Sequence, residues 1–246
     1  SIGEWAGEPF ELAPWQAFCV WSISGWRNID TRRRRFRKAQ MSVARKNGKT
    51  TLVAGMGLQL QFFDDPIEEG AQLYCVATKE DQAKLLYAEA ARMVSKSPSL
   101  SRRARVRKAP ASINWEERNS FFRPLGSDSE GTDGLNPHAI LMDELHAWTE
   151  RHRALKEKLE TGGGARSQPL QVIITTAGDD RSELWKEEDK YAVDVLENAA
   201  VGKFIDDTYF AYICRLDEAD DIFDPKNWPK ANPNYGVSVK PEYLSN

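Results

Sequence analysis

The stretch AQMSVARKNGKT, residues 39–50, joins an apolar strand pattern to a helix pattern that runs over residues 50–63. The turn between them contains Gly48, and glycine lets the backbone approach a ligand closely. In such a strand–turn–helix unit, the amides of the turn and of the helix N-terminus point at phosphate oxygens. Lys49 would reach the β- and γ-phosphates of a nucleotide, and the Thr50 hydroxyl would bind Mg²⁺. The stretch therefore predicts a phosphate-binding loop at residues 44–50.

This loop departs from the usual pattern GxxxxGK(S/T), which has glycine at the position of Val43. Arg45 and Lys46 also bring positive charge into the turn. A basic surface turn is therefore an alternative interpretation of the same residues. The choice between the two depends on what the rest of the chain provides.

Strand and helix patterns alternate along the chain. Buried-strand runs occupy residues 73–77, 138–142 and 170–175, and a strand pair is expected at residues 112–115 and 120–124. Helix patterns cover residues 79–95, 151–160 and 182–200. The alternation predicts an α/β fold with a mainly parallel sheet flanked by helices. With the phosphate-binding loop at residues 44–50, this arrangement resembles the P-loop NTPase fold of the ASCE, RecA-like type.

The periodic signal weakens near the C-terminus, although residues 209–214 are a candidate for a last strand. We expect a P-loop core over residues 1–205 and a lid or linker segment over residues 206–246. The composition is that of an ordinary globular chain, with 41% hydrophobic and 29% charged residues. No apolar run is long enough to cross a bilayer, and the histidines lack the spacing of a zinc site.

Positive charge is concentrated in two places although the net charge is only -3. Residues 27–49 contain ten Lys/Arg against one acid, Asp30, and include four consecutive arginines at residues 32–35. The second basic cluster consists of Arg102, Arg103, Arg105, Arg107 and Lys108. Each cluster is either a solvated face or a surface for phosphates of a nucleotide or a nucleic acid backbone.

Two acids follow the apolar run of residues 139–142. Asp143 would lie at the carboxyl end of a buried strand, where Mg²⁺ is held beside a nucleotide. Glu144 would act as the general base that polarises the attacking water. With a phosphate loop on a neighbouring strand, this pair favours nucleotide hydrolysis over a solvated strand end.

The next buried strand ends in Thr175, Thr176 and Ala177. Hydroxyls at that edge can sense the γ-phosphate through a water and pass its loss to the adjacent helix. An ordinary strand-to-turn cap is the alternative.

Together these motifs resemble the ATPase domain of a tailed-bacteriophage terminase large subunit of the HK97-like type, the motor that packages DNA into a procapsid. Residues 44–50 are similar to the deviant Walker A motif of that family, including its arginine, and residues 134–146 to its Walker B region. Residues 175–177 are similar to the coupling motif, and residues 228–244 to the stretch that leads to a nuclease domain. Trp15 and Gln16 resemble the segment that packs on the adenine.

The resemblance implies ATP and Mg²⁺ as cofactors and assigns roles to individual residues. Glu144, Lys49 and Arg45 would be catalytic, while Thr50 and Asp143 would hold the metal. The implied ATP-binding residues are Trp15, Gln16, Ala44, Arg45, Lys46, Asn47, Gly48, Lys49, Thr50 and Thr51.

It also implies partners. The parent protein would form a pentameric ring around double-stranded DNA, in the host cytoplasm at the procapsid, with portal protein and small terminase subunit and no membrane. A neighbouring subunit would supply an arginine to each active site. The candidates here are Arg102, Arg103, Arg105, Arg118 and Arg123.

Two other functions stay open at this point. Residues 143–146 also spell DExH, the signature of superfamily 2 helicases, although such helicases need a second RecA-like domain. A nucleotide-gated DNA-binding or assembly module with little intrinsic turnover is the non-enzymatic alternative.

Overall fold

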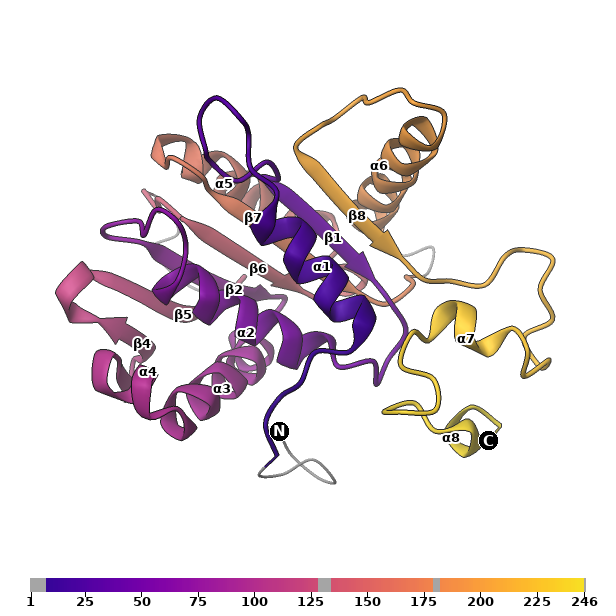
Figure 1. The fold of residues 1–246 in the computed structure, drawn as a ribbon, viewed down its shortest axis with the longest axis horizontal. Helices are drawn as coiled ribbons and strands as arrows, with labels where there is room; N and C mark the ends of the chain where they lie inside the picture. Colours follow the sequence, from indigo (N-terminus) through magenta and orange to yellow (C-terminus); the bar gives the residue numbers. More distant parts are fainter. Residues whose placement is uncertain (1–7, 128–133, 179–181, 246) are drawn as a thin grey trace.

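The computed structural model describes residues 8–127, 134–178 and 182–245. Within them, eight strands form one sheet in the order β3-β4-β5-β2-β6-β7-β1-β8 (Figure 1). The strands β1, β2 and β5–β8 run parallel, while β4 is antiparallel to both β3 and β5. Their bounds are β1 Lys38–Ser42, β2 Gln72–Ala77, β3 Arg105–Lys108, β4 Ala111–Trp115, β5 Ser120–Gly126, β6 Ala139–Asp143, β7 Leu170–Thr175 and β8 Tyr209–Ile213. The expected α/β fold with a mainly parallel sheet is confirmed.

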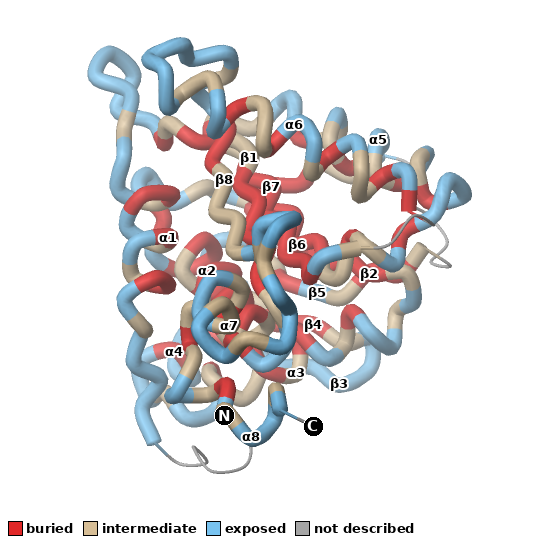
Figure 2. The backbone as a smooth tube through the Cα atoms, turned by 90° about the vertical axis from the view of Figure 1, so that its right-hand side faces the viewer, coloured by how far each residue is buried: buried red, intermediate tan, exposed pale blue. Residues whose placement is uncertain are grey.

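Helices cover both faces of this sheet, as Figure 2 shows with the buried strands between α2 and α3 on one side and α5 and α6 on the other. The described helices are α1 Pro14–Gly25, α2 Lys49–Phe62, α3 Glu80–Lys96, α4 Pro98–Arg103, α5 Arg153–Gly162, α6 Glu183–Ala200, α7 Trp228–Ala231 and α8 Pro241–Leu244. Short 3-10 turns lie at Glu116–Arg118, Leu145–Ala147, Glu150–His152 and Gly163–Ala165.

Side chains along β2 alternate between two apolar cores. Leu73 and Cys75 pack into the larger core with α1, α2 and α3, whereas Tyr74 and Val76 pack into the smaller core with α5 and the start of α6. This is the period of two that a strand imposes, and burial on both faces explains why the strand reads as a continuous apolar run.

Helix α2 packs closely on the sheet. A Cβ atom at Gly57 would lie 2.9 Å from side-chain atoms of both Leu141 and Phe122. A side chain at this position would therefore push α2 away from the strands, and with it the loop at its N-terminus.

One strand of the sheet differs from expectation. Strand β3 was not predicted, because its residues Arg105–Lys108 are all exposed and mostly basic. Strand β8, expected as a candidate last strand at residues 209–214, is present and pairs in parallel with β1. The segment that carries α7 and α8 lies beyond the carboxyl ends of β1 and β8 (Figure 1).

Candidate active site

The carboxyl ends of β6, β7 and β1 lie side by side at one edge of the sheet. Asp143 of β6 is in register with Ile174 of β7, and Thr175 of β7 is in register with Ser42 of β1. The expectation that the phosphate loop and the acidic pair follow neighbouring strands is wrong, because β7 lies between them. The strand order thus brings Thr175 next to both.

The predicted phosphate loop connects β1 to α2. Lys46 and Gly48 both have left-handed backbone conformations, with φ of 67° and 79°. Such alternation turns successive amides toward one concave side, as in anion-binding nests. Arg45 and Lys46 are exposed on the loop, whereas Thr50 and Thr51 are half-buried in the first turn of α2.

Val43 occupies the place where the usual pattern has glycine. Its side chain is buried in the larger core, and its amide donates a hydrogen bond to the carbonyl oxygen of Thr175 at 3.2 Å. Val43 therefore continues the direction of β1 and fixes the start of the loop to the core and to β7.

The Lys49 ammonium is folded back onto its own loop. Its Nζ atom donates hydrogen bonds to the carbonyl oxygens of Val43 at 2.8 Å and Ala44 at 3.0 Å. Burial lowers the pKa of Lys49, and the nearby carboxylates of Glu144 and Asp143 offset only part of this effect. Phosphate oxygens would give this cation the counter-charge that the two carbonyls lack.

Asp143 lies at the end of β6 in an environment that disfavours its charge. Burial, and then the negative charge of Glu144, raise the pKa of Asp143 to about 6. Its Oδ1 atom is buried and has no hydrogen-bond partner in the described part of the chain. A carboxylate oxygen of this kind is a suitable ligand for a hard divalent cation such as Mg²⁺.

Glu144 has a left-handed backbone conformation, with φ of 53° and ψ of 51°. Non-glycine residues seldom adopt this conformation, and it is concentrated at functional sites. Burial would raise the pKa of Glu144, but His146, Lys49 and Arg45 together hold it below its ordinary value. Glu144 therefore remains ionised, which its predicted role as general base requires.

His146 lies between Glu144 and the carboxyl end of β7. Its Nδ1 atom lies 3.0 Å from Oε2 of Glu144 and 3.2 Å from the hydroxyl oxygens of both Thr175 and Thr176. The 3-10 turn Leu145–Ala147 that follows Glu144 brings the imidazole back over the end of β7. No role for His146 in this site was predicted, although it stands only two residues after Glu144.

The three residues predicted to couple hydrolysis to motion occupy different environments. Thr175 is fully buried, and its hydroxyl donates a hydrogen bond to the carbonyl oxygen of Thr176 at 2.8 Å. Thr176 is buried beside His146, and Ala177 is exposed. The two hydroxyls thus both lie 3.2 Å from the imidazole nitrogen that contacts Glu144.

The sequence model of the family described as terminase large subunit, ATPase domain, matches residues 14–194. The chain belongs to this family. The large terminase subunit of Enterobacteria phage HK97 is 23% identical over 239 residues, covering 96% of this chain and 44% of that protein. Protein YmfN of Escherichia coli is 39% identical over 112 residues, covering 46% of this chain and 23% of that protein. The chain thus spans less than half the length of these two relatives.

Solved structures agree with this assignment. The crystal structure of the HK97 large terminase has a TM-score of 0.79 at 22% identity, covering 98% of this chain and 47% of that chain. A Thermus phage large terminase ATPase domain has a TM-score of 0.53 at 14% identity, covering 78% of this chain and 83% of that chain. A thermophilic bacteriophage large terminase in complex with ADP has a TM-score of 0.50 at 13% identity, covering 79% of this chain and 44% of that chain. At these identities the likeness shows the fold, and the family match confirms the prediction of an ATP hydrolase.

In this terminase ATPase domain, the two residues expected to contact adenine are both buried, and Gln16 lies beside the loop. The Trp15 ring is stacked on Tyr212, with ring centroids 5.6 Å apart. Gln16 accepts a hydrogen bond from the Ala13 amide, and its Nε2 atom lies 3.1 Å from a Cβ built at Gly48. Contact of either side chain with the base stays a prediction.

The five candidate arginines of the terminase domain lie on α4, β3, β5 and the β4–β5 turn. Arg103 and Arg123 lie over the rings of Phe63 and Phe121, and Arg118 is 3.4 Å from a carboxylate oxygen of Glu69. In the described structure no ion pair or ring contact involves Arg102 or Arg105. Their side chains are exposed, so these two have the fewest competing contacts for a role in trans.

Proposed function

We propose that this domain hydrolyses ATP at the edge formed by β6, β7 and β1, and that in its parent protein hydrolysis drives double-stranded DNA into a procapsid. The observation that carries the proposal is the convergence of Lys49, Asp143 and Glu144 at one sheet edge, with His146 joining Glu144 to the coupling residues. The family match favours this function over the superfamily 2 helicase alternative.

Each residue has a distinct task in the proposed reaction. The amides of residues 46–50 and the Lys49 ammonium would bind the β- and γ-phosphates of ATP. Glu144 accepts a proton from the water whose oxygen attacks the γ-phosphorus. The bond from that phosphorus to the β–γ bridging oxygen breaks, and its electron pair leaves with ADP. Arg45, exposed on the loop, would contribute positive charge near the transferred group.

Asp143 and the Thr50 hydroxyl would hold Mg²⁺, in keeping with the unpartnered Oδ1 atom of Asp143. When bound, the ion neutralises charge that develops on the phosphate oxygens. The raised pKa of Asp143 fits this arrangement, because a nearby cation stabilises the ionised carboxylate.

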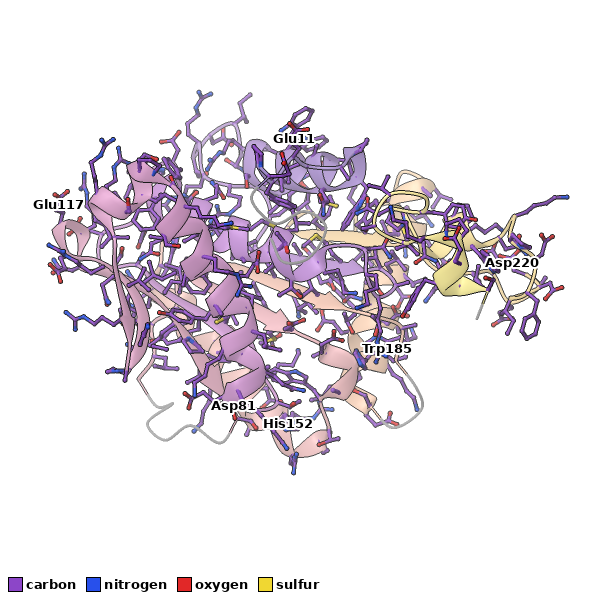
Figure 3. The ribbon with its side chains drawn as sticks, turned by 90° about the horizontal axis from the view of Figure 1, so that it is seen from below. Glu11, Asp81, Glu117, His152, Trp185 and Asp220 are labelled. Atoms are coloured by element: carbon purple, nitrogen blue, oxygen red, sulfur yellow. The ribbon has the colours of Figure 1, made fainter. Side chains whose placement is uncertain are left out.

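The basic cluster on α4 and β3 is the stronger candidate for contact with DNA phosphates. Arg102, Arg103 and the strand Arg105–Lys108 are all exposed. In the other cluster, by contrast, Arg34 is buried in an ion pair with Asp64 and Arg35 is paired with Asp207. The acidic segment that carries Asp220 projects at the opposite end of the molecule from Glu117 of the β4–β5 turn (Figure 3). Backbone contacts without base readout would suit sequence-independent packaging.

The assembled state belongs to the same proposal. A pentameric ring around the DNA, portal protein and small terminase subunit as partners, a nuclease domain after residue 246 and an arginine supplied in trans would complete the motor in the host cytoplasm. Within the described part of the chain, no helix is long and apolar enough to cross a membrane.

The variant Glu144→Gln tests the assigned base. We expect kcat for ATP hydrolysis to fall about a hundredfold to ten-thousandfold while Mg·ADP affinity stays within a factor of about three. The matched control is Glu150→Gln, which removes an exposed carboxylate paired with Arg153 and should hydrolyse ATP like the wild type. Turnover retained by Glu144→Gln would refute the role of Glu144.

DNA dependence tests the motor function. Double-stranded DNA should stimulate ATP hydrolysis, with a strong decline as salt is raised and without strand separation. The double variant Arg102→Ala and Arg103→Ala should weaken this stimulation more than Arg32→Ala and Arg33→Ala, which removes the same charge elsewhere. Equal effects, or strand separation, would count against the proposed surface or the packaging function.

A further inference from the structure

The segment of residues 231–238, near the C-terminal end of the chain, is hydrogen-bonded to the phosphate loop. Asn234 donates twice to Asn47, from its backbone amide to Oδ1 at 2.9 Å and from Nδ2 to the carbonyl oxygen at 3.1 Å. The Ser238 hydroxyl donates to the carbonyl oxygen of Lys46 at 2.7 Å. Asn47 returns a bond from Nδ2 to Oδ1 of Asn232 at 3.0 Å.

The contacts among the three asparagines are buried, whereas the contact of Ser238 with Lys46 is exposed. Asn47, Asn232 and Asn234 are all buried. Asn234 Oδ1 also accepts a hydrogen bond from Nε1 of Trp15 at 2.9 Å, which fixes the orientation of its amide group. A buried, fully directed amide of this kind specifies one geometry for both segments that it joins.

The bonds act on two consecutive peptide carbonyls of the loop. In a trans peptide the carbonyl oxygen and the following N–H point in opposite directions. Ser238 and Asn234 draw the carbonyls of Lys46 and Asn47 outward, so the amides of Asn47 and Gly48 face the other way. Among the described residues, neither amide has a hydrogen-bond acceptor. Both are therefore free for phosphate oxygens.

We infer that Asn234 is a positioning residue for phosphate binding, and that Ser238 has the same role at the preceding peptide. The inference rests on the proposed function, because it assumes that the loop binds the phosphates of ATP. The segment 231–238 thus forms part of the nucleotide site although it lies about 190 residues from the loop in sequence. By reciprocity, phosphates on the loop stabilise the segment as much as the segment stabilises their binding.

The first measurement is the affinity of the Asn234→Ala variant for Mg·ADP and for AMP, by competition with a fluorescent ADP analogue. We expect about tenfold weaker ADP binding and less than a twofold change for AMP, which lacks the β-phosphate that the loop amides bind. The matched control is Asn227→Ala, since Asn227 lies outside the segment 231–238 and, among the described residues, its Nδ2 atom donates to the Asp221 carbonyl and not to the loop. Wild-type ADP affinity in Asn234→Ala, or an equal loss for AMP, would overturn the inference.

The second measurement is hydrogen exchange of residues 228–239 with and without Mg·ADP. The nucleotide should slow exchange in the wild type and in Asn227→Ala, but not in Asn234→Ala or in the loop variant Lys49→Ala. If Asn234→Ala fails to fold, Ser238→Ala replaces it, with about threefold weaker ADP binding expected. A wild-type domain that binds no ADP would refute the proposed function, whereas normal binding with no nucleotide-dependent protection would refute the inference alone.

Discussion

Asp64 and Asp143 are two carboxylates with different surroundings. Asp64 lies beside residues that precede β1, β6 and β7, whereas Asp143 lies at the carboxyl end of β6. Asp64 accepts hydrogen bonds from Arg34 at 2.9 and 3.3 Å and from the Gln168 side chain at 3.0 Å, and it lies 3.0 Å from Nε2 of His138. Burial alone would raise the pKa of Asp64, but these partners hold it below its ordinary value. Asp64 is thus a satisfied charge.

Asp143 presents the opposite case. One of its oxygens has no partner in the described structure, and its pKa is raised to about 6. The cation that could pair with it, Lys49, is bonded to loop carbonyls instead. A buried charge alone therefore does not indicate a binding site. A buried charged group whose oxygen has no partner is a stronger indication, because a bound ligand or cation can supply the missing partner.

Substitution of the two carboxylates should change the free energy of unfolding in clearly different ways. Asp64→Asn leaves Arg34 buried without its counter-ion, and we expect a loss of about 3–5 kcal/mol in the free energy of unfolding. Asp143→Asn removes a charge that the fold does not compensate, so its stability should be equal to or above that of the wild type. Urea denaturation of both variants measures this difference.

A surface pair provides the control for this prediction. Glu69→Gln breaks the exposed contact with Arg118 and should cost less than about 1 kcal/mol. If Asp64→Asn were no more destabilising than Glu69→Gln, the buried network would not stabilise the fold in the way proposed.

The sequence predicted most of the elements around both carboxylates. Strands β2, β6 and β7 are buried on both faces, so they appear as continuous apolar runs, and amphipathic helices such as α3 and α6 show their period directly. Strand β3 was missed because an exposed, basic edge strand has neither signal. The insertion of β7 between β1 and β6 was also missed, because strand order depends on packing between distant segments.

The residues of the candidate site likewise fall into those that the sequence predicted and those that it did not. The loop residues are contiguous in sequence, and so are the two acids, so residue types and spacing were sufficient to propose both groups as site residues. His146 joins them only because Glu144 adopts a left-handed conformation, which no local pattern near it indicated. The contacts of Asn234 with Asn47 span too many residues for any periodic signal to reveal them.

The pH dependence of stability provides a second, smaller contrast. The folded pKa of Asp143 is about 6, above its ordinary value of 3.8, so this group favours the folded state most at pH below 3.8. That contribution is lost as the pH rises through 6, and it amounts to roughly 3 kcal/mol at most. Asp64 has the opposite sign, because its lowered pKa contributes stability above pH 3.8 that is lost in acid.

The difference in unfolding free energy between wild type and Asp143→Asn isolates the first effect. Measured from pH 4 to pH 7, it should move steadily in favour of the variant, and Mg·ADP should reduce that movement. A difference that does not change with pH would show that the pKa of Asp143 is not raised in the folded protein.

Substitution of His146 should have a smaller effect than the changes in stability and in pH dependence predicted above. We expect His146→Ala to lower kcat for ATP hydrolysis about tenfold with little change in KM, because its imidazole positions Glu144 without touching the phosphates. His146→Asn places an amide nitrogen near the position of Nδ1 and should recover part of the lost rate. Steady-state kinetics at saturating and limiting ATP distinguishes kcat from KM. An increase in KM at unchanged kcat would instead place His146 in ground-state binding, and would remove it from the path between the acidic pair and Thr176.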